Sequence, residues 1–295
     1  MVEMRAPDVR DVRLAQGRRL RVRRWPGEGR PLVLLHGLLD DSEGWTGLAM
    51  DTRRPCFAMD LPGFGGSDLP LQPRINAYAD DVAAGLRRLA IDECTLVGHS
   101  LGGAVATAVA ERHERVHSLV LLAPAGYGHI RLAEWFALPG VRDVAQLMLP
   151  LALVSPLLVT AGYTTFVAHG RLPSRDLTER LRRRAFQSAP GVRTAVSAIA
   201  AAGRSKRGFH RRQVGFEGPV AALWGQRDAL VPLDHTRAVK AALPQTHLEV
   251  WPRMGHHPQR ERPAQLARFI ERHAATEPAV AKPARATRTR SARRG

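Results

Sequence analysis

A serine, an aspartate and a pair of histidines, residue types that together perform nucleophilic catalysis, each follow a predicted strand. Ser100 lies in the segment Gly98–Gly102, Asp228 follows an apolar run, and the pair His256–His257 follows the last apolar run. A serine hydroxyl is a poor nucleophile at neutral pH, so a histidine must take its proton. An aspartate can then hold the imidazole in the required tautomer and stabilise the imidazolium. The chain therefore contains the side chains needed for attack on a carbonyl carbon.

The serine is expected in a sharp turn between a strand and a helix. Residues 94–97 predict a short buried strand, and residues 104–110, rich in alanine and valine, predict a packed helix. Glycines two positions before and after Ser100 let the chain fold back beside a strained serine backbone. The hydroxyl should then stand clear, with the N–H of Leu101 directed to where negative charge would develop.

These features make the chain resemble the α/β-hydrolase family, whose nucleophile elbow has this strand–turn–helix pattern. The family order of serine, acid and histidine implies a triad of Ser100, Asp228 and His256. The run from Gly255 to Pro263 is similar to the family's segment at its catalytic histidine, which assigns His256 rather than its neighbour. Because both loops open at the carboxyl edge of a parallel sheet, the three side chains can converge.

The resemblance also implies an oxyanion loop at His36–Leu39, after the predicted strand 31–35. The N–H of Leu38 would face the N–H of Leu101, and one such donor is worth ~3–4 kcal/mol of transition-state stabilisation. We expect the His36 side chain only to brace this loop.

Other polar residues near these motifs are expected to have structural roles. Asp60 and Asp68, in a glycine-rich segment, should satisfy turn backbone. His99 should pack or brace its turn, and His257 should point away from the triad.

Eight apolar runs predict strands, at residues 9–14, 20–25, 31–35, 56–59, 94–97, 118–123, 219–224 and 248–251. The first two flank a turn and should pair antiparallel. Helical patterns at residues 40–49, 77–89, 104–110 and 259–273 alternate with strands, which predicts a mostly parallel sheet covered on both faces. The expected class is α/β, with a mostly parallel eight-stranded sheet flanked by helices and an inserted helical cap.

The cap is expected at residues 126–215, between core segments 1–125 and 216–274. No strand is predicted there, and residues 144–170 carry no charged side chain. That run is long enough to span a bilayer, but Pro150 and Pro156 should split it into short helices. We therefore expect apolar helices that cover the active site. Further helices should start after an N-cap at Ser174 and cover residues 192–202.

Composition adds weaker limits. The net charge of +17 comes almost entirely from arginine, which fits either an anionic partner or a GC-rich genome. Cys56 and Cys94 should be buried free thiols, and no apolar signal segment starts the chain, so a cytoplasmic protein is expected. Residues 275–295 predict a disordered basic tail, with at most weak contact to an anionic surface and no obligate nucleic acid.

The predicted function is hydrolysis of an ester-like or related carbonyl substrate, a small molecule, through an acyl-serine intermediate. Two alternative reactions, carbon–carbon bond hydrolysis and acyl transfer, would use the same triad. The non-enzymatic alternative is a ligand-binding protein on this scaffold. Serine at position 100 argues against haloalkane dehalogenases and epoxide hydrolases, which resemble this chain but carry aspartate there. No cofactor is implied, and the histidines lack metal-ligand spacing.

Overall fold

The computed structural model describes residues 6–167, 172–173, 175–187, 189–203 and 214–274. Within them one sheet has the order β1-β2-β4-β3-β5-β6-β7-β8. The strands are β1 (Asp8–Arg13), β2 (Arg19–Trp25), β3 (Leu32–Leu35), β4 (Cys56–Met59), β5 (Cys94–His99), β6 (Val116–Leu122), β7 (Val220–Gly225) and β8 (His247–Trp251). β2 pairs antiparallel with β1 and β4, and all other pairs are parallel. The expected mostly parallel α/β sheet is confirmed.

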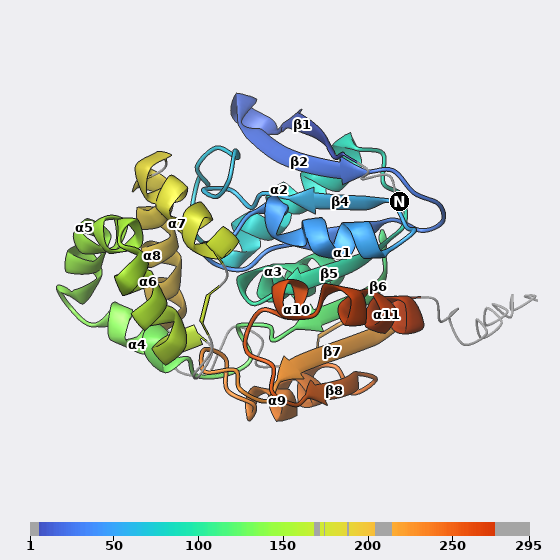
Figure 1. The fold of residues 1–295 in the computed structure, drawn as a ribbon. Helices are drawn as coiled ribbons and strands as arrows, with labels where there is room; N and C mark the ends of the chain where they lie inside the picture. The colour runs from blue at the N-terminus through green and yellow to red at the C-terminus, as the bar shows by residue number, and fades with distance from the viewer. Residues whose placement is uncertain (1–5, 168–171, 174, 188, 204–213, 275–295) are drawn as a thin grey trace, which may run out of the picture.

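Helices cover both faces of the sheet (Figure 1). One apolar cluster joins α2 (Ile75–Arg88), α3 (Leu101–Ala110) and α9 (His235–Ala242) to one face, and a second joins α1 (Thr46–Asp51) and α11 (Pro263–Ala274) to the other. Successive residues of each central strand enter opposite clusters, as in Leu32 and Val33. This two-sided burial explains why these strands are continuous apolar runs.

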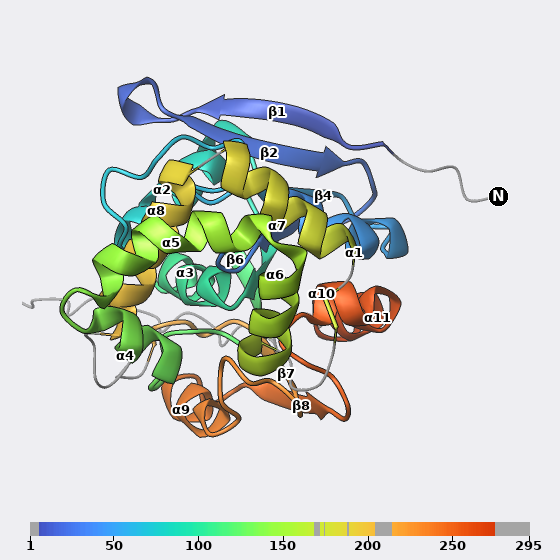
Figure 2. The ribbon, with the colours of Figure 1, turned by 60° about the vertical axis from the view of Figure 1, so that its left-hand side comes forward.

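Between β6 and β7 the chain forms a group of helices that we call the cap (Figure 2). Its elements are α4 (Arg131–Ala137), α5 (Val141–Val154), α6 (Pro156–Gly162), a π-helical turn η3 (Tyr163–Val167), α7 (Arg175–Gln187) and α8 (Ala189–Gly203). They enclose a small apolar cluster of their own, which includes Leu153, Val159 and Leu181. The remaining short helices are η1 (Ala15–Gly17), η2 (Ser42–Trp45) and α10 (Pro258–Glu261).

Proline positions divide the helices differently from our expectation at two places. Pro150 lies inside α5 and does not split it, since Leu153 beyond it is anchored in the cap cluster. The break comes at Ser155, whose hydroxyl accepts a hydrogen bond from the Leu158 N–H at 3.4 Å and caps α6. The helix expected at 259–273 is two helices, α10 and α11, that part at Arg262 because the residue before Pro263 disfavours helical angles.

Two further expectations concern the cap and the tail. Ser174 as an N-cap, and the tail at residues 275–295, lie outside the described residues. None of the described helices is by itself long and apolar enough to cross a membrane. α4 and α5 meet that criterion only together, and their axes are bent by 112°.

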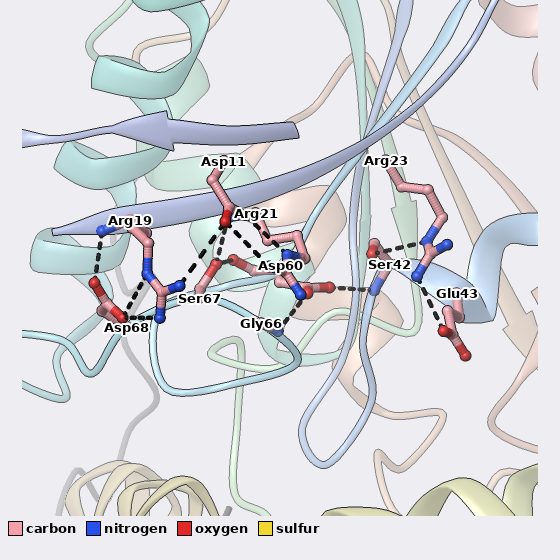
Figure 3. Close-up of polar contacts among 10 residues, drawn as sticks. All are labelled: Asp11, Arg19, Arg21, Arg23, Ser42, Glu43, Asp60, Gly66, Ser67 and Asp68. Atoms are coloured by element: carbon pink, nitrogen blue, oxygen red, sulfur yellow. Dashed lines mark hydrogen bonds and ion pairs between the residues drawn. The ribbon is translucent and has the colours of Figure 1, made fainter. Parts of the chain in front are cut away.

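An arginine of the cap ties α7 to the core. Arg180 donates from Nη1 to Glu43 Oε2 at 2.9 Å and lies 3.4 Å from Asp41 Oδ1, with 14% of its side chain exposed. The other oxygen of Glu43 accepts from Arg23 Nη2 at 3.0 Å (Figure 3). One carboxylate therefore joins a core strand to a cap helix.

We expect Arg180→Ala to lower the free energy of unfolding by about 1–2 kcal/mol, because it leaves part-buried carboxylates without this cation. The matched control is Arg182→Ala on the same helix, whose pair with Glu179 is solvent-exposed. Its effect should stay below about 0.5 kcal/mol. Urea unfolding of both variants measures the difference, and equal effects would contradict this role for Arg180.

Candidate active site

Ser100 stands at a strained turn between β5 and α3. Its φ of 52° and ψ of −115° lie where L-residues are rarely found. A Cβ on Gly98 would lie 2.4 Å from the Gly102 oxygen, and one on Gly102 would lie 2.3 Å from the Leu35 oxygen. Both glycines are therefore required for close backbone approach, and the strained serine turn expected from the sequence is present.

Asp228 and His256 form a buried pair at the same edge of the sheet. His256 Nδ1 lies 2.7 Å from Asp228 Oδ2, and the two side chains are 2% and 0% exposed. The other carboxylate oxygen of Asp228 accepts from the N–H groups of Leu230 and Val231, each at 2.9 Å. These bonds fix the carboxylate, and the carboxylate orients the imidazole with Nε2 away from it.

The structure does not join Ser100 to His256 by a hydrogen bond. His256 Nε2 is buried and has no hydrogen-bond partner among the described residues. The two loops are nevertheless tied together, because His99 Nε2 lies 2.7 Å from the backbone oxygen of His256. In enzymes without substrate such catalytic bonds are often long and shorten only when substrate binds. With Nδ1 engaged by Asp228, Nε2 is the nitrogen available to accept a proton.

His99 braces the Ser100 turn against the loop that contains His256. Gln259 Nε2 donates to His99 Nδ1 at 3.1 Å, which assigns the proton to Nε2 and makes that atom the donor to the His256 oxygen. Burial, aided by the neighbouring imidazoles, lowers the pKa of His99 well below its usual value, which keeps this tautomer neutral. The bracing role expected for His99 is confirmed.

The loop after β3 lies against the nucleophile turn. A Cβ on Gly37 would stand 3.1 Å from the Ser100 Cβ. His36 accepts at Nε2 from the Leu61 N–H at 2.9 Å and contacts the Gly37 oxygen at 2.7 Å through Nδ1, so it braces this loop as expected. Leu101 is the first residue of α3, and its N–H has no acceptor within the helix. The assignment of the Leu38 and Leu101 N–H groups as oxyanion donors stays a prediction.

The carboxylates of the glycine-rich segment have the structural roles expected of them (Figure 3). Asp60 accepts from the N–H groups of Ser42 at 2.6 Å and Gly66 at 2.7 Å. Asp68 pairs with Arg19 at 2.8 Å. Both carboxylates are therefore engaged in structural contacts, and Asp60 also lines a polar pocket between β2 and the cap, whose lining includes neither Asp228 nor His256.

A tyrosine of the cap reaches the loop that contains His256 and His257. Tyr163, in η3, places its hydroxyl 3.4 Å from His257 Nδ1, and the two rings stack with centroids 5.7 Å apart. His257 thus turns to the cap and away from Asp228, as expected. Sequence reasoning missed Tyr163, because a single tyrosine in a long uncharged run carries no signal of where it packs.

A separate cluster at the opposite end of β8 could hold a cation. His247 Nε2 and His273 Nε2 lie 3.5 and 3.7 Å from Glu249 Oε1. Arg272 Nη2 approaches the same oxygen at 3.2 Å and neutralises it. The cluster lies at the amino end of β8, whereas His256 follows the carboxyl end, so it has no contact with the candidate active site.

Comparisons with known proteins agree with the fold described above. The alpha/beta hydrolase fold family matches residues 30–263. An uncharacterised protein of Mycobacterium tuberculosis is 31% identical over 292 residues, which cover 93% of this chain and 84% of the relative. A 2-hydroxy-6-oxononadienedioate/2-hydroxy-6-oxononatrienedioate hydrolase of Comamonas testosteroni is 26% identical, covering 80% and 84%. A thermophilic esterase from Thermogutta terrifontis superposes with a TM-score of 0.72 at 23% identity, covering 90% and 97%.

His257 should make the protein less stable in acid. Burial lowers the pKa of His257 from 6.5 to about 3. As the pH falls below about 6.5, His257 therefore becomes protonated in the unfolded chain while it stays neutral in the folded protein. The free energy of unfolding should therefore fall by about 1.4 kcal/mol per pH unit from this group between those two values. His257→Asn should remove that part of the slope in urea unfolding between pH 6 and pH 4. An unchanged slope in the variant would contradict the pKa assignment.

Proposed function

Because this chain belongs to the alpha/beta hydrolase fold family, we propose that it is a serine hydrolase with Ser100, Asp228 and His256 as its triad. The observation that carries the proposal is the buried 2.7 Å contact between His256 Nδ1 and Asp228 Oδ2. It stands at the sheet edge where the strained Ser100 turn also lies. A buried carboxylate that orients an imidazole beside a strained serine has the geometry that activates a hydroxyl.

In the proposed reaction His256 Nε2 takes the Ser100 proton while Oγ bonds to the substrate carbonyl carbon. Asp228 stabilises the imidazolium without accepting its proton. The N–H groups of Leu38 and Leu101 receive the oxyanion. Collapse of the tetrahedral intermediate expels the leaving group, which takes the proton from His256, and leaves an acyl-serine. Water, activated by the same imidazole, then releases the acid.

The proposed substrate class is a small molecule with an ester or related carbonyl under the apolar cap. The esterase among the structural neighbours shares the fold, and the Comamonas relative is named as a hydrolase of an oxo-dienedioate. That relative supports carbon–carbon bond hydrolysis as a second candidate, which needs the same triad. Acyl transfer would differ only in the group that resolves the acyl-serine, and product analysis with a panel of acceptors separates the three. Two buried free thiols fit the expected cytoplasmic location.

We expect Ser100→Ala to abolish labelling by a fluorophosphonate probe, because the proposed nucleophile is lost. Turnover of a substrate that the parent accepts, such as a p-nitrophenyl acyl ester, should fall by up to ~10⁶. Circular dichroism checks that the variant is folded. Labelling of the alanine variant at the parental rate would contradict the assignment of the nucleophile. A folded parent that the probe does not label at all would favour the ligand-binding alternative.

Asp228→Asn should reduce kcat by ~10⁴, because an amide stabilises the wrong imidazole tautomer while it keeps the packing. The matched control is Asp234→Asn, which alters an exposed aspartate shortly after Asp228 in the chain. Its kcat should remain within about twofold of the parent, since it touches no group of the triad. Similar losses in both variants would argue against Asp228 as the orienting acid.

A further inference from the structure

Most of the exposed large apolar side chains of the described residues lie in the cap. Among the described residues thirteen large apolar side chains are exposed, and nine of them lie between residues 135 and 172. They are Trp135, Leu138, Val144, Leu147, Met148, Leu151, Leu157, Leu158 and Leu172. Exposed apolar groups are normally scattered, and a cluster of them marks an interaction surface.

Helix α5 forms the centre of this surface. Val144, Leu147, Met148 and Leu151 are spaced i, i+3, i+4 and i+7, so they form one stripe along the helix. On another side of α5, Leu153 is buried in the cap cluster. α5 is therefore apolar both where it packs and where it meets solvent, and the internal packing of the cap does not explain its outer stripe.

Two neighbouring helices extend the surface on either side of α5. α4 adds Trp135, which is 68% exposed, and α6 adds Leu157, which is 77% exposed. Figure 2 shows α4, α5 and α6 together on the near side of the cap, and α5 packs against both. We call this set of exposed side chains on α4, α5 and α6 the apolar cap face.

An arginine borders the apolar cap face. Arg131 lies one turn before Trp135, on the same side of α4. Arg193 of α8 is exposed, but its backbone oxygen accepts from Gln146 Nε2 at 3.4 Å on the side of α5 that also carries Leu153, away from the exposed stripe. Neither arginine forms an ion pair with a described residue. Residues 126–203 contain nine arginines and four acidic residues, so the segment that carries the surface is net positive.

We propose that the apolar cap face adsorbs to a lipid surface, with preference for anionic headgroups. Exposed leucines beside a tryptophan and arginines are the composition of segments that lie in the plane of a membrane interface. The bend of 112° between α4 and α5 and the anchoring of Leu153 in the cap hold the helices flat on the protein instead of across a bilayer. Arg131 at the border and the net positive charge of residues 126–203 match the negative charge of acidic lipids.

A second copy of the chain fits this surface less well. A symmetric dimer through the apolar cap face would place the same patch against itself. Arg131 of both copies would then be brought to one contact, where the carboxylates of α4 and α5 are already paired, Glu134 with His129 and Asp143 with Arg142. Anionic headgroups would instead neutralise Arg131. The chemistry of the border therefore favours lipid.

Adsorption would deliver a substrate to the cap from the lipid phase. α6 leads directly into η3, where Tyr163 contacts His257 next to the proposed base. Esters with long acyl chains, held in a membrane, are then the substrate class that this arrangement serves. This consequence rests on the proposed function, but adsorption itself does not.

The test is co-sedimentation of the full chain with vesicles of phosphatidylcholine, alone or with about one third phosphatidylglycerol. We expect binding that is stronger with phosphatidylglycerol and weakened by salt. Leu147→Glu and Leu151→Glu should each lower the partition coefficient about tenfold or more, since each places a charge in the contact. The matched control is Val250→Glu on β8, outside the cap and 44% exposed, which should change it less than about twofold. Circular dichroism confirms that all variants are folded.

Two further measurements show whether lipid or a second copy of the chain covers the apolar cap face, and whether Trp135 enters the lipid. Tryptophan emission should shift to shorter wavelength on vesicle binding, and Trp135→Phe should remove most of that shift. Equal binding by Leu147→Glu and Val250→Glu would overturn the proposal. So would a parent dimer, seen by analytical ultracentrifugation without vesicles, that Leu147→Glu dissociates, because the occupant would then be a second copy. Ser100→Ala should bind vesicles like the parent, so failure of the triad and failure of adsorption are distinguishable.

Discussion

The candidate active site depends on the parallel pairing of β7 with β8. The register that sets Gly225 beside Trp251 ends both strands at one edge, where Asp228 and His256 follow within a few residues. A Cβ on Gly225 would stand 2.1 Å from the Gly255 oxygen, so the two loops touch through backbone alone. The 2.7 Å contact of the acid with the imidazole is a product of that closeness. Without this shared edge, nothing in the chain would bring two residues 28 positions apart into contact.

A second set of buried bonds connects this pair to the Ser100 turn. His99 is the last residue of β5, and it holds the backbone of the His256 loop while Gln259 holds His99. The glycine-enforced turn after β5 fixes Ser100, and the loop after β3 packs on it. The site is thus built from the ends of four parallel strands, each held by backbone contacts, which leaves little freedom for its side chains.

Much of this architecture could be predicted from the sequence. Strands covered on both faces are continuous apolar runs, and the Gly98–Gly102 turn has a distinctive glycine spacing, so the sheet and the elbow were both evident. The helix boundaries of the cap were harder to predict, because tertiary packing sets them more than local proline or glycine signals do. Pro150 stayed within α5 since distant contacts outweighed one lost hydrogen bond. The contact of Tyr163 with His257 and the missing bond between Ser100 and His256 are tertiary details that no local pattern encodes.

The place of the cap in the chain has a consequence for how such proteins diversify. The segment leaves the sheet after β6 and returns at β7, and these strands are immediate neighbours with Leu122 beside Leu223. Because the points where the chain leaves and re-enters the sheet are adjacent, an insertion of almost any length can connect them without distorting the strands. Evolution can therefore exchange or remodel this module while the sheet edge that carries Ser100, Asp228 and His256 keeps its geometry.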